Sequence, residues 1–90
     1  MVKKIFKITN EAGLHARPAT LLVNVAVQFD SNISLNALGK SIDFKSIMGV
    51  MSLGVYSGTT VEIICDGRDE EDAMKALKDK ILELKLGKEI

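Results

Sequence analysis

The 90-residue chain is long enough for one modest hydrophobic core but not for two lobes around a deep cleft. Its 12 basic and 12 acidic residues cancel, so net charge provides no attraction to nucleic acid or to an anionic membrane. With no Trp, one Tyr and no apolar stretch that could span a bilayer, the sequence predicts a single cytoplasmic domain over residues 1–90, without direct nucleic-acid contact or membrane insertion.

The first half of the chain predicts a strand, a helix and a second strand. Phe6 and Ile8 alternate with polar neighbours, which is the period of a half-buried strand. An apolar run from about Ala16 to Phe29 includes a proline near its start and predicts a helix, although three valines make its helix propensity weak. Alternation returns over residues 33–37 and predicts the second strand.

The middle of the chain predicts a hairpin, a short helix and a fourth strand. A turn at Gly39-Lys40 leads into the alternating residues 42–44. A short helix is expected from Ile47 to Leu53, with Ser46 as its N-cap and Gly54 as its terminator. Residues 61–65 alternate again and contain the one cysteine, Cys65, which we expect to be a buried strand residue rather than a reactive thiol.

The last predicted element is the clearest helix. Asp69 is placed to cap it, and the three acidic residues that follow suit the positive end of its dipole. Its apolar stripe consists of Ala73, Leu77, Ile81 and Leu84. The order βαββαβα predicts an α+β fold, an open-faced two-layer sandwich in which three helices cover one face of a four-stranded antiparallel sheet.

The one histidine, His15, stands directly before the first predicted helix. Pro18 lies in the first turn, where its missing N–H costs nothing, so it fixes the helix start just after His15. The backbone amides of Ala16 and Arg17 are then free, and the Arg17 guanidinium adds donors that match phosphate oxygens. A helix N-terminus with a nearby arginine is an anion site.

Two interpretations of His15 are open from these residues. The simpler one is that His15 caps the helix or lies in a loop. The other is a phosphoryl-transfer site, because neutral imidazole is a nucleophile near neutral pH and two amides with one arginine would hold a phosphoryl group without burying it. One histidine and one distant cysteine are too few ligands for a metal site, and we expect no cofactor.

Two long motifs, GLHARPAT at residues 13–20 and KSIMGVMSLG at residues 45–54, closely resemble the HPr family, the histidine-containing phosphocarrier proteins of the bacterial phosphoenolpyruvate-dependent sugar phosphotransferase system. The resemblance covers essentially the whole chain and implies the same four-stranded, three-helix sandwich. It implies that His15 accepts a phosphoryl group from phospho-enzyme I and passes it to the IIA domain of a sugar-specific enzyme II, with Arg17 stabilising the phosphate. The chain is then not an enzyme but a substrate of partner enzymes, and we expect a monomer.

The second motif resembles the Gram-positive type of the family, in which an ATP-dependent HPr kinase/phosphorylase phosphorylates a serine at the position of Ser46. Helix capping alone would also account for this serine. A phosphate there would join the positive end of a helix dipole and add about −1.5 to −2 charges, enough to deter a docking partner without refolding. In the family, the seryl-phosphorylated form also binds a catabolite-control transcription factor as corepressor.

A partner-docking surface is expected around the two motifs. Its residues come from the first helix and the short helix: Thr20, Asn24, Val27, Ile47, Met48 and Met51. Methionine suits a surface that fits several partners, although the Met and Ile side chains could equally belong to the core. The first helix lacks a lysine common in the family, which leaves Arg17 and Lys45 as the nearby cations, and Ala12 replaces a small polar residue often found near the histidine.

Three other functions are compatible with parts of the sequence. A regulatory paralogue would keep the serine and lack the histidine, and a carrier of the nitrogen-related branch would handle no sugar. His15 argues against the first of these, and the KSIMGVMSLG segment argues against the second. From a different class, a small ligand-binding or dimerising α+β module would use the residues before Pro18 only as a helix cap.

Overall fold

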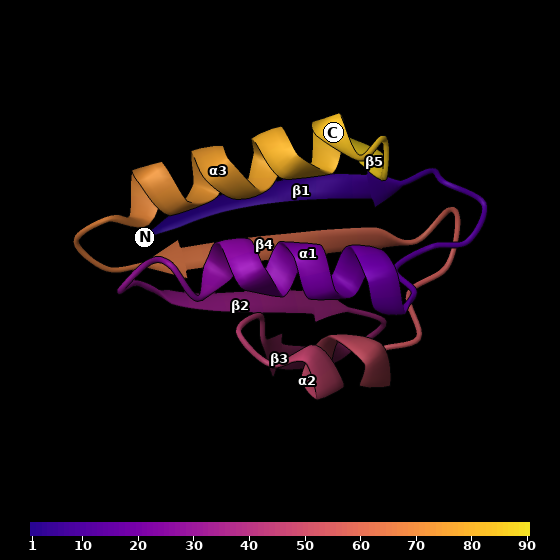
Figure 1. Ribbon diagram of the computed structural model, residues 1–90, viewed down its shortest axis with the longest axis horizontal. Helices are drawn as coiled ribbons and strands as arrows, with labels where there is room; N and C mark the ends of the chain where they lie inside the picture. Colours follow the sequence, from indigo (N-terminus) through magenta and orange to yellow (C-terminus); the bar gives the residue numbers. More distant parts are fainter.

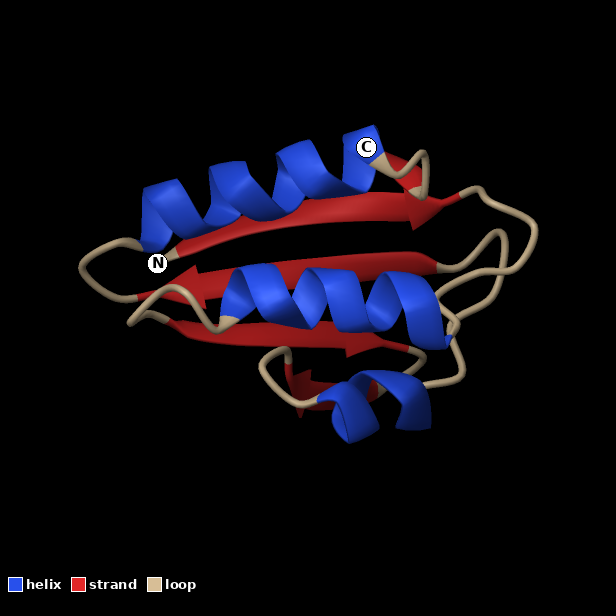
Figure 2. Ribbon diagram, in the orientation of Figure 1, coloured by secondary structure: helices blue, strands red, loops and turns tan.

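The computed structural model describes residues 1–90 and has an α+β architecture in two layers (Figures 1 and 2). The elements in chain order are β1 (Val2–Ile8), α1 (Ala16–Ala26), β2 (Asn32–Ala37), β3 (Lys40–Asp43), α2 (Ile47–Ser52), β4 (Thr60–Asp66), α3 (Glu70–Glu83) and β5 (Gly87–Glu89). The strands form one antiparallel sheet in the order β3-β2-β4-β1-β5, and the three helices cover one of its faces. This is the predicted open-faced sandwich, with one strand more than expected. None of the helices combines the length and the apolar character needed to cross a membrane.

The alternation read from the sequence places one set of strand side chains in the core. These side chains face the helices and are buried: Phe6, Ile8, Ile33, Leu35, Val61, Ile63 and Cys65. Cys65 is fully buried, and burial raises the pKa of its thiol to about 11, so the thiol stays protonated at neutral pH. The prediction of a buried strand cysteine is confirmed.

The fifth strand is the main difference from the predicted topology. The last residue of α3 is Glu83; Leu84 is its C-cap, and the chain then turns back so that Gly87–Glu89 pairs with the free edge of β1. Glu89 contacts Lys78 of α3 and Lys4 of β1, and hydrogen bonds to both lower the pKa of its carboxyl. A three-residue polar strand has no hydrophobic period, so it forms through this tertiary pairing and not through local preference.

The first helix and the hairpin turn also differ from the prediction. Helix α1 ends at Ala26 and not at Phe29, because the chain tightens there: the Phe29 amide donates to the Ala26 carbonyl oxygen, three residues back, at 3.2 Å. The turn of the β2–β3 hairpin is formed by Leu38 and Gly39, whose φ values are 54° and 78°. Lys40 already pairs with Ala37, so it belongs to the strand, and the two-residue loop suits a tight hairpin.

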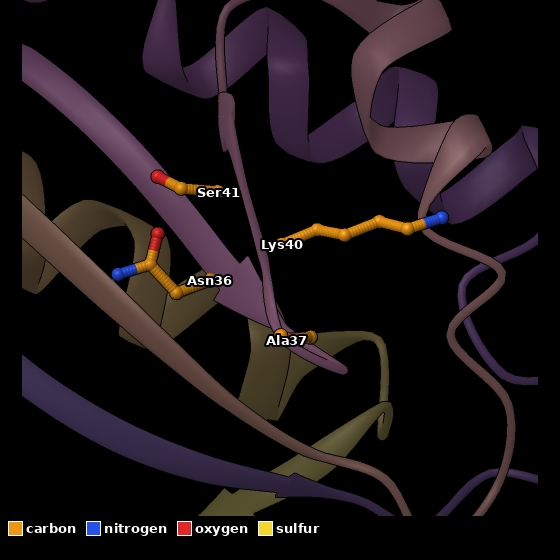
Figure 3. Close-up of a pocket in the computed structure, with 5 residues that line it drawn as sticks. Asn36, Ala37, Lys40 and Ser41 are labelled. Carbon is orange, nitrogen blue, oxygen red and sulfur yellow. The ribbon is translucent and has the colours of Figure 1, made fainter.

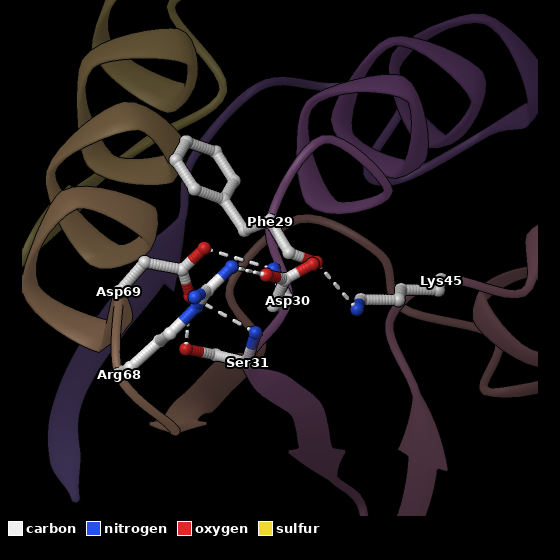
Figure 4. A network of polar contacts seen from close by, with 6 residues as sticks. All are labelled: Phe29, Asp30, Ser31, Lys45, Arg68 and Asp69. Atoms are coloured by element: carbon white, nitrogen blue, oxygen red, sulfur yellow. Dashed lines mark hydrogen bonds and ion pairs between the residues drawn. The ribbon is translucent and has the colours of Figure 1, made fainter.

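Asp69 does not cap α3 with its side chain, which corrects the sequence-based expectation (Figure 4). Its carboxylate reaches across to the loop between α1 and β2, where it accepts hydrogen bonds from the Asp30 amide at 2.8 Å and the Ser31 amide at 2.9 Å. The Ser31 hydroxyl also donates to it, and Arg68 forms an ion pair with Asp30. The hydrogen bonds that the Asp69 carboxylate accepts lower its pKa, and the bond from the Ser31 hydroxyl contributes most. The start of α3 is thereby held against the loop that joins α1 to β2.

Candidate functional site

His15 lies at the N-cap position of α1, on the loop that joins β1 to this helix. Its backbone is extended, with φ −81° and ψ −175°, and its carbonyl oxygen accepts a hydrogen bond from the Ala19 amide at 3.0 Å. The imidazole is exposed and makes no capping hydrogen bond. The side chain is therefore not used as a helix cap, which excludes the first half of the simpler interpretation; the second half, a residue in a loop, agrees with its position.

The first turn of α1 presents two backbone N–H groups beside His15. The amides of Ala16 and Arg17 have no acceptor in the chain, as is usual for the first residues of a helix. Pro18 is buried at the third helical position, where its missing N–H leaves no bond unmade. The Arg17 guanidinium is exposed and takes part in none of the ion pairs of the molecule. Together these groups make this end of α1 a site for an anion.

Gly13 holds the loop before His15 against the segment that follows α2. The Leu14 amide donates to the Val55 carbonyl oxygen at 3.0 Å. Gly13 has a φ of 63°, and a Cβ atom there would lie 2.4 Å from that carbonyl oxygen and 2.5 Å from the Cα of Tyr56. Only glycine permits such an approach of two backbones. The glycine of the first motif thus places His15, and it does so through the backbone alone.

A hollow of about 170 Å³ lies beside His15. Its lining comes from the β1–α1 loop, the first turns of α1 and the chain after α3: Asn10, His15, Arg17, Pro18, Leu21, Leu84 and Leu86. Asn10 lies outside both motifs and was not predicted from the sequence as a site residue. The sequence feature that could have identified it is an Asn three residues before a Gly, which is the pattern of a tight turn. The Gly13 amide closes that turn by donating to the Asn10 carbonyl oxygen at 3.1 Å. Leu84 and Leu86 reach the site through the packing of α3, which no local pattern predicts.

Ser46 caps α2, as its position before the short helix predicts. Its Oγ accepts a hydrogen bond from the Gly49 amide at 3.0 Å, and its side chain is only partly exposed. The helix ends at Ser52, and Gly54 follows with a φ of 67°, which confirms it as the residue that stops the helix. A group attached to this oxygen would lie at the start of α2.

The predicted docking residues lie on the outer surfaces of α1 and α2. On the α1 side, Thr20 is half-buried, Asn24 is exposed, and Val27, just past the helix, is 53% exposed. The three on α2 are 40%, 79% and 39% exposed: Ile47, Met48 and Met51. Such exposure excludes the alternative that these α2 side chains belong to the core. Their apolar surface is free to contact another protein.

Lys45 does not stand beside His15, contrary to the expectation from the sequence. Its Nζ donates to the Phe29 carbonyl oxygen at 2.7 Å, beyond the last turn of α1 (Figure 4). Since α1 begins at Ala16 and its 11 residues rise about 16 Å, Lys45 serves the far end of the helix. Arg17 is the cation that lines the His15 hollow.

Another hollow, of about 380 Å³, lies at the β2–β3 hairpin (Figure 3). It is lined by Asn36, Ala37, Gly39, Lys40 and Ser41 and shares no residue with the hollow beside His15. None of its residues is a nucleophile activated by a neighbouring base. The chain also has no group of three or more His, Cys, Asp or Glu side chains arranged to hold a metal ion.

The sequence matches a known family over most of its length. A profile of the PTS-HPr family, described as the PTS HPr component phosphorylation site, matches residues 2–83. The matched range includes His15, Ser46 and the first turn of α1.

Several solved structures resemble this one closely. The histidine-containing phosphocarrier protein of Mycoplasma is 40% identical, with a TM-score of 0.94 over 96% of this chain and 98% of that one. HPr from Thermoanaerobacter tengcongensis is 47% identical, with a TM-score of 0.87 over 94% of each chain. The Bacillus subtilis catabolite repression protein Crh, which forms a swapped dimer, is 42% identical, with a TM-score of 0.72 over 92% of this chain and 95% of that one.

Proposed function

The chain belongs to the HPr family of phosphocarrier proteins of the phosphotransferase system, and on that premise we propose that His15 accepts a phosphoryl group from phospho-enzyme I and passes it to the IIA domain of a sugar-specific enzyme II. A family member of this kind is a carrier and not an enzyme. The observation that supports the proposal most is the exposed His15 imidazole beside two amides without acceptors and a free guanidinium.

The transfer needs little beyond positioning and charge neutralisation. The lone pair of a neutral ring nitrogen of His15 forms the N–P bond, while the bond from phosphorus to the donor side chain breaks and its electron pair leaves with the donor. The amides of Ala16 and Arg17 and the Arg17 guanidinium hold the phosphoryl oxygens. The same groups hold them when an acceptor side chain attacks in the next step, so the P–N bond stays exposed for onward transfer.

Successive partners would dock on the surface that extends from His15 along α1 and α2. Thr20, Asn24 and Val27 from the α1 side, with Ile47, Met48 and Met51 from α2, offer a surface of mixed polarity. The methionines have no fixed shape and adapt to different partners. A carrier that presents its site in this way works as a single-domain cytoplasmic monomer, with no nucleic-acid contact of its own.

The test is transfer from phosphoenolpyruvate through enzyme I. We expect the wild-type protein to gain an acid-labile, base-stable phosphate and His15→Ala to gain none, with Arg17→Ala labelled at least about tenfold more slowly because a charge-assisted contact is lost. Labelling is measured by radioactive phosphate and by intact mass. Persistent labelling of His15→Ala would contradict the assignment of the site.

We further propose that Ser46 is a regulatory site for an HPr kinase/phosphorylase. A phosphate on its Oγ would lie at the positive end of α2 and beside the exposed side chains of Ile47 and Met48, so a partner that docks there would meet added negative charge. The KSIMGVMSLG motif and the similarity to Crh, a catabolite repression protein, support this role. The phosphoserine form would then bind a catabolite-control transcription factor.

Ser46→Asp and Ser46→Ala separate charge from capping. Aspartate keeps an N-cap oxygen and adds a charge, so we expect Ser46→Asp to accept phosphate from enzyme I at least about tenfold more slowly than wild type. Alanine removes only the cap, at a cost of about 1 kcal/mol in the free energy of unfolding, and should accept phosphate at close to the wild-type rate. Equal rates for Ser46→Asp and wild type would show that charge at this position does not regulate transfer.

His15 separates this proposal from that of a regulatory protein without carrier activity. A regulator controlled only through Ser46 would have no use for the free amides and guanidinium at the start of α1. The enzyme I assay decides between the two roles, since a regulator of that kind would not be labelled.

A further inference from the structure

Asn10 lines the same hollow as His15 and is held by three hydrogen bonds. Its backbone amide donates to the Leu86 carbonyl oxygen at 3.2 Å, which ties it to the chain after α3. Its side-chain Nδ2 donates to the Gly13 carbonyl oxygen at 2.9 Å, and the Gly13 amide donates back to the Asn10 carbonyl oxygen at 3.1 Å. The asparagine therefore has a defined position two residues from Ala12, which carries no polar side chain.

The other side-chain atom of Asn10, Oδ1, has no partner. A carbonyl oxygen only accepts, so the bond to Gly13 requires Nδ2 on that side and leaves Oδ1 on the other. Oδ1 is shielded from solvent, and no donor of the chain, the exposed His15 ring included, lies within hydrogen-bond distance of it in this conformation. Unpaired buried acceptors are uncommon, because each one loses its bonds to water without replacement.

The hollow is lined by two side chains that could donate to this oxygen, and the Arg17 guanidinium is already assigned to the phosphoryl oxygens, which leaves the His15 ring. Apart from Asn10, its polar lining consists of His15 and Arg17. When one nitrogen of a neutral imidazole attacks phosphorus, the other nitrogen keeps its proton, and the ring becomes formally cationic. The N–H of that ring is a stronger donor than before, and an acceptor on its far side fixes both the orientation and the tautomer of the imidazole.

We propose that Asn10 is a positioning residue for phosphoryl transfer, whose Oδ1 accepts a hydrogen bond from the ring N–H of His15 when the exposed imidazole turns into the hollow. The bond selects the tautomer that leaves the other ring nitrogen free to face the amides of Ala16 and Arg17. It also stabilises the positive charge that the ring gains as the N–P bond forms. The inference rests on the proposed carrier function, and it gives the otherwise unpaired oxygen of Asn10 a role.

The chain provides a matched control in Asn36. This residue also has a shielded Oδ1 without a partner, and its Nδ2 donates to Glu62 at 3.1 Å. It lies on β2 between the core residues Leu35 and Ala37, so its side chain projects from the face of the sheet that carries no helix. Asn36→Ala therefore removes the same side-chain amide group, at a position that is not near His15.

The experiment compares wild type, Asn10→Ala, Asn10→Asp and Asn36→Ala by two measurements. Nitrogen-15 NMR of the His15 ring reports its tautomer and the solvent exchange of its N–H, and single-turnover labelling by phospho-enzyme I reports the transfer rate. We expect wild type and Asn36→Ala to show one dominant tautomer, and Asn10→Ala to lose that preference and to be labelled roughly tenfold more slowly. Asn10→Asp keeps an acceptor oxygen but not the bond to Gly13, so it should keep the tautomer preference.

Each outcome decides the role of Asn10. A wild-type ring with the same tautomer mixture as free histidine would overturn it, even if Asn10→Ala failed to fold. Loss of the preference in Asn10→Asp as well as in Asn10→Ala would overturn the acceptor role. If wild type is labelled and Asn10→Ala is labelled as fast as Asn36→Ala, the positioning role is contradicted and the carrier function is still supported. If wild type is not labelled at all, the carrier function falls and the role of Asn10 in transfer falls with it.

Discussion

At the scale of single residues, the site depends on a close backbone contact of Gly13 that only a glycine allows. Gly13 places its Cα against the carbonyl of Val55 and the backbone of Tyr56, with a φ of 63°. His15 follows two residues later, so an error in the position of Gly13 is passed directly to the imidazole. The sequence motif contains this requirement, but its physical reason becomes visible only when the segment after α2 is seen to pack on it.

Gly13→Ala should be strongly destabilising. The left-handed backbone costs about 1–2 kcal/mol for an alanine, and displacing the Val55–Tyr56 backbone costs about 1–3 kcal/mol more. Urea unfolding at neutral pH measures the loss. Gly39→Ala is the control, because Gly39 also has a positive φ, 78°, but open space around it. A loss at Gly13 no larger than that at Gly39 would show that the backbone contact is unimportant.

At the scale of elements, segments far apart in the chain are joined by contacts that sequence periodicity does not reveal. The carboxylate of Asp69 holds the Asp30 and Ser31 amides, and the C-terminal strand β5 covers the edge of β1. Gly87 lies so close to β1 that a Cβ there would be 2.2 Å from the Lys7 carbonyl oxygen. Leu86 lies directly before β5, and its carbonyl oxygen accepts a hydrogen bond from the Asn10 amide, so this C-terminal segment supports the site as well as the sheet.

The Asp69 network makes stability depend on pH in a predictable direction. Hydrogen bonds to the charged carboxylate lower its pKa in the folded protein, the Ser31 hydroxyl contributing most and the Asp30 amide next. A carboxyl group with a lowered folded-state pKa stabilises the fold above its usual pKa, and this contribution is lost as the pH falls through the folded value. Asp69→Asn should therefore be less stable than wild type at pH 7, and the difference should shrink as the pH falls below 4.

Urea unfolding of both proteins between pH 7 and pH 2 checks this expectation. Asp79→Asn is the control, because Asp79 forms an exposed ion pair with Lys75 that contributes little at any pH. A stability difference between Asp69→Asn and wild type that stays constant over the whole range would contradict the account of the network.

At the scale of the whole molecule, local patterns predict the elements and the layers but not the contacts between segments far apart in the chain. Alternation in residues 6–9, 33–37 and 61–65 was sufficient to predict three strands and their buried faces, because each strand has one face toward solvent and one face toward the core. The motif around His15 predicts the helix start and the free amides for the same local reason. The fifth strand, the bonds of Asp69, the position of Lys45 and the bond between Asn10 and Leu86 all join residues far apart in the chain, and no local pattern contains them.

The two phosphorylation sites proposed for this molecule lie at the starts of two neighbouring helices. His15 is exposed before α1, and Ser46 is partly buried as the cap of α2. The exposed apolar side chains of α2 lie next to Ser46 in the chain, so a partner that reaches His15 across α2 would sense the state of both sites. A carrier and its control can thus share one docking surface in a chain of 90 residues.

The central claim is that this chain carries a phosphoryl group between two proteins, and the full relay tests it most directly. Labelled phosphoenolpyruvate is mixed with enzyme I and a IIA domain, with and without this protein, and the label on IIA is followed over time. We predict that label reaches IIA only when the wild-type protein is present, and that His15→Ala does not support the transfer. Label on IIA in the presence of His15→Ala, or none in the presence of wild type, would contradict the account.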